Sequence, residues 1–173
     1  KDTISGFDRF GTYNYNASIT TKVYGILNFK PKNKVQSIRH TITPSISYSN
    51  NPSFEKYYDT YIIDANGNTA EYTRFQGGLY PSPGRNYSSS IGFSVQNKLE
   101  AKLKPKDSTE TELRKINIFS NLNISASYNL AVEEFNLSPI RVTGAIDLAP
   151  GLKLNTGATF DPYALDENNQ RIN

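Results

Sequence analysis

The chain has 173 residues, a formal net charge of +3 and no cysteine, methionine or tryptophan. The missing cysteines exclude disulfides, thiolate metal sites and cysteine nucleophiles within these residues. The positive charge is small and diffuse, whereas a nucleic-acid surface needs a basic stripe, so we expect no nucleic acid among the partners. Only 36% of residues are apolar, and no run approaches the roughly 18 apolar residues of a membrane helix.

Apolar and polar residues alternate along residues 11–30, which predicts a first β-strand that ends before Pro31. Residues 38–49 alternate in the same way and predict a second strand. Pro44 lies on the apolar row of this strand. Because proline has no amide proton to donate, we expect it to interrupt the strand, through an edge, a bulge or an interrupted pairing, with a local kink.

The alternation stops over residues 50–86, where turn residues are frequent. Within this stretch, residues 57–63 and 69–75 flank an Asn66-Gly67 turn and predict a small β-hairpin. The stretch also carries more aromatic side chains than a solvated linker would. We therefore expect a long, partly ordered loop.

The longest alternation covers residues 87–103, and three further strands are predicted at 116–130, 140–148 and 152–162. Strands of globular proteins usually have about five or six residues. A strand tilted across a bilayer needs roughly nine to eleven and can continue beyond it. The length of the predicted strands therefore favours a membrane barrel.

Together these patterns predict an all-β fold, an antiparallel up-and-down transmembrane β-barrel wall in which every second residue faces lipid. All of residues 1–173 would belong to one outer-membrane β-barrel domain. About six strands are too few to close a barrel, since natural single-chain barrels begin at about eight, so we expect part of a larger one. Long barrel loops lie outside the cell, which places the 50–86 loop on the extracellular side. The alternative is a soluble, adhesin-like β-sandwich made of shorter strands.

Aromatic residues of the apolar rows gather at the strand ends next to the 50–86 loop. A girdle of amphipathic rings at headgroup depth is typical of membrane barrels. The predicted aromatic girdle comprises Tyr13, Tyr15, Tyr48, Tyr87, Tyr128 and Phe160.

The opposite, polar rows carry more basic than acidic residues and would line the barrel lumen. The candidate lumen-facing basic residues are Lys22, Arg39, Lys98, Lys102, Arg141 and Lys153, against Glu100, Asp147 and Asp161. Such a surplus would suit phosphorylated anionic glycolipid headgroups. Ordinary solvation of a lumen with cross-strand charge pairing is the alternative explanation.

The residue patterns indicate no catalytic or metal-binding group. His40 is the only histidine of the chain. The stretch Asp64–Asn68 partly imitates a calcium loop, but Phe75 stands where the bidentate glutamate would be needed. We therefore expect a protein that is not an enzyme and that uses no metal or other cofactor.

The run Ile38–Tyr48, with its Arg39-His40 pair and Pro44, resembles a strand of the lipopolysaccharide-assembly outer-membrane protein family LptD. Residues 75–80, 90–94 and 160–166 are similar to its continuation, in the divergent long-loop versions of the C-terminal β-barrel portion. Within these 173 residues we expect no counterpart of the N-terminal jellyroll domain of the family, and the cysteines of its better-known members are missing from them.

The resemblance implies a structural part of the outer-membrane translocon that inserts lipopolysaccharide into the outer leaflet. The implied partners are lipopolysaccharide, membrane lipid, the plug lipoprotein LptE, the remainder of the barrel chain and periplasmic bridge proteins. Without the resemblance, another outer-membrane barrel, such as a porin or a nutrient receptor, fits the pattern as well.

Overall fold

A computed structural model describes residues 6–105, 112–149 and 151–172 of the chain. One large sheet contains β1 (Tyr15–Thr20), β2 (Val23–Asn28), β3 (Val35–Asn51), β6 (Ser88–Leu103), β7 (Arg114–Asn129), β8 (Ile140–Ala149) and β9 (Leu152–Phe160). Two small hairpins pair β4 (Tyr58–Ile62) with β5 (Thr69–Thr73) and β10 (Ala164–Leu165) with β11 (Arg171–Ile172). A 3-10 turn, η1, covers Glu55–Tyr57. No helix among the described residues is long and apolar enough to cross a membrane.

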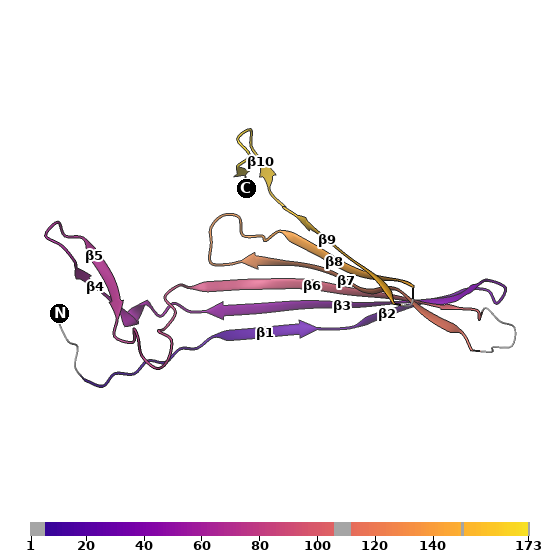
Figure 1. Cartoon of the computed structure of the whole chain (residues 1–173), viewed down its shortest axis with the longest axis horizontal. Helices are drawn as coiled ribbons and strands as arrows, with labels where there is room; N and C mark the ends of the chain where they lie inside the picture. Colours follow the sequence, from indigo (N-terminus) through magenta and orange to yellow (C-terminus); the bar gives the residue numbers. More distant parts are fainter. Residues whose placement is uncertain (1–5, 106–111, 150, 173) are drawn as a thin grey trace.

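The large sheet is an antiparallel meander with the order β1-β3-β6-β7-β8-β9, in which β2 pairs with β3 beside β1. Figure 1 shows these strands side by side, with β4 and β5 beyond one end of the sheet. Each connection between neighbouring long strands reverses the chain, because all pairings are antiparallel. The all-β, up-and-down wall is confirmed, and its sheet is open rather than closed into a barrel.

The register places the apolar rows of neighbouring strands on the same face, because directly paired residues of an antiparallel sheet point to the same side. One such row contains Pro44, Val95, Ile124, Val142 and Ala158, and the next contains Ile46, Phe93 and Ala126. Among the residues whose side chains are described, which leaves out 148 and 149, Phe54 and Ala101 are the only buried apolar side chains besides a fully buried proline in the 50–86 loop. No second layer covers the described sheet, so the sandwich alternative is wrong.

The predicted first strand is divided into β1 and β2, with Thr21 and Lys22 between them. Both pieces pair with β3 in one register, and the gap lies opposite Pro44. The amide of Thr21 donates to the carbonyl oxygen of Pro44 at 3.2 Å. Pro44 has no amide to return this bond. β3 itself continues through Pro44, which pairs with Val95 on its other side.

The pairing of β6 with β7 contains two register shifts. Asn97 pairs with Leu122 and Glu100 pairs with Asn117, so three steps along β6 correspond to five steps along β7. The extra residues form bulges in β7. Because two residues are inserted, the faces agree again beyond the bulges. Between them, Phe119, which simple alternation assigns to the polar row, lies opposite Leu99 of the apolar row.

The 50–86 loop is folded around aromatic side chains. Phe54 is 6% exposed, and its ring packs edge to face on Tyr13, with 5.4 Å between centroids. Tyr57 and Phe75 pack together at 5.8 Å, and both contact the ring of Phe10. The loop therefore has a small core of its own, to which the segment before β1 contributes.

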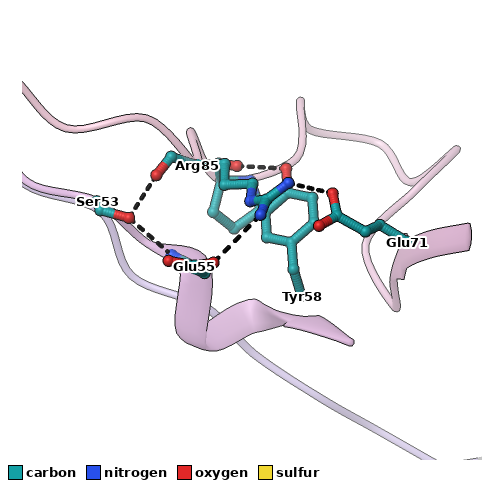
Figure 2. Close-up of polar contacts among 6 residues, drawn as sticks. Ser53, Glu55, Tyr58, Glu71 and Arg85 are labelled. Carbon is teal, nitrogen blue, oxygen red and sulfur yellow. Dashed lines mark hydrogen bonds and ion pairs between the residues drawn. The ribbon is translucent and has the colours of Figure 1, made fainter. Parts of the chain in front are cut away.

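Arg85 joins the two ends of this loop (Figure 2). Its guanidinium pairs with Glu55 at 3.2 Å and also with Glu71 of β5, while its carbonyl oxygen accepts a hydrogen bond from the hydroxyl of Ser53. The hydrogen bond with Glu55 is the main cause that raises the pKa of Arg85 above its ordinary value. Beside it, the hydroxyl of Tyr58 donates to the backbone of the loop at 2.6 Å.

We expect Arg85→Gln to loosen the 50–86 loop and leave the sheet intact. The substitution removes both ion pairs that connect η1 and β5 to the segment just before β6. The measurement is limited proteolysis of the intact protein, in which loop cleavage should become several-fold faster. Arg74→Gln is the matched control, since Arg74 makes a single exposed pair with Asp8 at 3.3 Å. Equal cleavage rates in the two variants would contradict the central role of Arg85.

Candidate functional site

Basic side chains gather on the polar face at the end of the sheet away from the 50–86 loop. Arg39 of β3, Lys98 and Lys102 of β6 and Lys115 of β7 surround Glu100 of β6. The register explains the grouping, because one polar row pairs Arg39 with Glu100, and the adjacent row pairs Lys102 with Lys115. We call these five residues the basic cluster.

Glu100 is the centre of the basic cluster and is only 3% exposed. Its Oε2 accepts hydrogen bonds from Nε and Nη2 of Arg39, at 3.0 and 2.5 Å. Its Oε1 lies 2.7 Å from Nζ of Lys115 and 3.1 Å from Nζ of Lys98. The carboxylate therefore forms ion pairs with three cations, which themselves stay about half exposed. Four basic side chains share one acid, so the cluster keeps a positive charge.

A hollow of about 500 Å³ opens beside Glu100 on this face. Its lining combines six polar or charged side chains with one apolar side chain: Ile26, Asn28, Ser37, Arg39, Glu100, Lys102 and Lys115. The lining residues come from β2, β3, β6 and β7. The hollow is thus built by four adjacent strands and depends on their register.

The other predicted basic residues lie apart from the cluster. Lys22 stands exposed in the gap between β1 and β2. Arg141 of β8 lies in a second hollow, of about 520 Å³, whose lining is rich in serine. Lys153 pairs with Asp147 at 3.7 Å. The structure therefore groups three of the six candidates and leaves three separate.

Lys115 was not among the predicted site residues. The alternation places the start of its strand at 116, two residues too late, because β7 begins at Arg114. Lys115 directly precedes the first apolar residue of that strand and continues its polar row. That signal could have added it to the basic rows.

The predicted girdle residues lie at the sheet end next to the 50–86 loop. Tyr48 and Tyr128 both face Ile91, so their side chains share one row of the apolar face. The remaining members stand at or just outside strand ends: Tyr13, Tyr15, Tyr87 and Phe160. All six rings are exposed by 39% or more.

Tyr13 and Tyr87 also contact groups outside the girdle. The ring of Tyr13 packs on Phe54 and so joins the core of the loop as well. The hydroxyl of Tyr87 accepts a hydrogen bond from the side chain of Asn50 at 3.1 Å. The girdle residues therefore connect the sheet with the loop that follows β3.

A comparison with protein families decides the assignment. The family model described as "LptD protein" matches residues 1–163, which is most of the chain. The chain belongs to the LptD family. LptD proteins act in lipopolysaccharide transport at the outer membrane and form a transport and structural family, not an enzymatic one. Searches of curated proteins and of solved structures found no match to this LptD chain.

We expect Glu100→Gln in the LptD chain to lower the free energy of unfolding by about 1–3 kcal/mol, because charge-assisted hydrogen bonds from three cations are lost. The cations are half exposed, so water takes up part of the cost. The measurement is the urea midpoint of the intact protein in detergent micelles.

Asp147→Asn is the matched control for this change. It removes the carboxylate of a single, longer pair with Lys153 on the same face, and pairs of that kind contribute below about 1 kcal/mol. Equal midpoints for the two variants would show that Glu100 does not organise the basic cluster.

Proposed function

We propose that this chain forms part of the wall of the translocon that inserts lipopolysaccharide into the outer leaflet. The observation that carries the proposal is the uncovered apolar face of a sheet of long strands. β3, β6 and β7 have 17, 16 and 16 residues, more than the roughly nine to eleven that cross a bilayer. A face of this kind is stable in contact with hydrocarbon. Membership of the LptD family points to lipopolysaccharide as the molecule that is transported.

The edges of the sheet support an assembly with further strands. β1 and β2 lie at one edge and β9 at the other, and edge strands present unpaired backbone amides and carbonyls. In hydrocarbon these groups must be paired, which is why membrane sheets close. The remainder of the barrel chain would supply the missing strands on both sides. The plug lipoprotein LptE and periplasmic bridge proteins complete the proposed set of partners.

The 50–86 loop suggests how the proposed wall is oriented in the outer membrane. Its aromatic core and its Arg85 ion pairs favour a folded cap over a mobile tail. A cap outside the barrel would hinder escape into the medium and favour sideways release of an amphiphile, whose acyl chains gain by staying in hydrocarbon. On this proposal the basic cluster lies toward the periplasmic end.

Depletion of the intact protein from cells tests the proposal. Lipopolysaccharide labelled on the cell surface should fall, while newly made lipopolysaccharide accumulates on the inner side of the outer membrane. A porin or nutrient receptor would instead lose uptake of small solutes with surface lipopolysaccharide unchanged. That second result would contradict the translocon proposal and favour a porin or a nutrient receptor.

We expect Val95→Arg and Ile124→Arg to cost about 2–4 kcal/mol each near the bilayer midplane, because both side chains face lipid on this proposal. Their matched controls on the adjacent polar rows, Ser94→Arg and Asn123→Arg, should cost less than about 1 kcal/mol. Folding of the intact protein into vesicles, followed by urea titration, measures the difference. Equal tolerance at the two sets would contradict the face assignment.

Deletion of residues 55–80 should leave the barrel assembled but make the outer membrane permeable to large antibiotics, because the cap is removed without any strand of the wall. Antibiotic sensitivity and heat-modifiable migration of the intact barrel are the measurements. A label at Asn66 should react from outside the cell. Loss of barrel assembly, or labelling only from the periplasm, would contradict the loop assignment. The proposed orientation of every strand would then have to be reversed.

A further inference from the structure

Two lysines face each other in the basic cluster. Lys102 of β6 and Lys115 of β7 are directly paired across the strands, so both side chains leave the same face. Like charges directly opposite in a sheet destabilise it. Nothing in the β-propensity of lysine compensates for this, since lysine is depleted in strands. The pairing therefore has a cost that an anion between the two ammonium groups would remove.

Glu100 relieves only part of this repulsion. It binds Lys115, Lys98 and Arg39, and no ion pair of Lys102 is found among the described residues. Glu100 lines the hollow together with Arg39, Lys102 and Lys115, but it is only 3% exposed. The buried acid thus positions Arg39 and Lys115, while their exposed halves and Lys102 still face solvent.

The neutral residues of the hollow complete the set of donors. Asn28 and Ser37 are paired with each other, and Ser37 is paired with Lys102, so amide, hydroxyl and ammonium groups form one row. An arginine from the adjacent row provides a planar fork suited to phosphate oxygens. A phosphate monoester carries about −1.5 to −2 charge and three strong acceptor oxygens. Its charge and its acceptors match this hollow better than a single carboxylate would.

We propose that the hollow between Arg39, Lys102 and Lys115 binds a phosphate group. The source follows from the proposed function, on which this part rests: a phosphorylated glycolipid passing the wall would place its phosphate here. Glu100 acts as a positioning residue, because it holds two of the three cations without touching the phosphate. Free inorganic phosphate has the same chemistry and is the other possible source.

Lys102→Gln is the decisive variant, because it removes charge from the hollow without breaking an ion pair found among the described residues. Lys153→Gln is the matched control, a lysine of the same polar face outside the hollow, and Lys102→Arg keeps the charge. Binding to the intact protein in detergent micelles is measured by calorimetry with three probes. The probes are inorganic phosphate, a phosphorylated glucosamine-disaccharide lipid, and the same lipid after phosphatase treatment.

We expect the phosphorylated lipid and inorganic phosphate to bind and to compete with each other. Lys102→Gln should weaken both by about tenfold, as expected for one lost charge-assisted contact. Lys153→Gln should leave both unchanged, and Lys102→Arg should restore most of the affinity. In phosphate-free buffer, Lys102→Gln should unfold at the same or a higher urea concentration than the parent, because a like-charge pair is removed. A merely structural lysine would not give this combination.

Binding of inorganic phosphate that depends on Lys102, without such dependence for the lipid, would support the phosphate site and assign it to the free ion. The proposal is overturned if Lys102→Gln binds every probe like the parent, or if the dephosphorylated lipid binds as tightly as the phosphorylated one. Failure of the proposed translocon function would give a different result. Surface lipopolysaccharide would persist when the protein is depleted from cells, while phosphate binding would still depend on Lys102.

Discussion

Directly paired residues of an antiparallel sheet point to the same side, and this constraint determines the chemistry of the whole wall. Because apolar residues alternate with polar ones on every long strand, pairing in register produces one apolar and one polar face. A slip by one residue would exchange the faces of a strand. The register from β3 to β9 therefore does more than hold the strands together. It separates the apolar surface from the surface that carries charge.

This separation leaves the isolated wall with unsatisfied surfaces. The apolar face has no covering layer among the described residues, and the edge strands have no partners on their outer sides. Both features are costly in water and acceptable in a membrane once further strands close the sheet. The same reasoning explains why so few side chains are buried within the chain. On the proposed function, lipid, the backbone ladder and the remainder of the assembly supply its stability.

The two ends of the sheet carry different chemistry. At one end, the loop after β3 forms a small aromatic core and is closed by the ion pairs of Arg85. At the other end, a buried glutamate on the polar face forms ion pairs with three of the four basic side chains of the basic cluster. An amphiphile that crosses such a wall would meet fixed cations before it reaches the cap. On the proposed function, the two ends would have separate roles, recruitment of anionic groups and control of release.

Local sequence determined the strands, the hairpin at Asn66-Gly67 and the identity of the two faces, because a period of two depends only on each strand itself. It also named Arg39, Lys98 and Lys102 as polar-face residues. Tertiary structure alone decided that these three meet at Glu100 and that Lys115 joins them, because their distances depend on the register of three strands. The bulges of β7, which bring Phe119 opposite Leu99, shift that register by two residues. Alternation along one strand contains no information on such a shift, since it reports the face of a residue and not its partner.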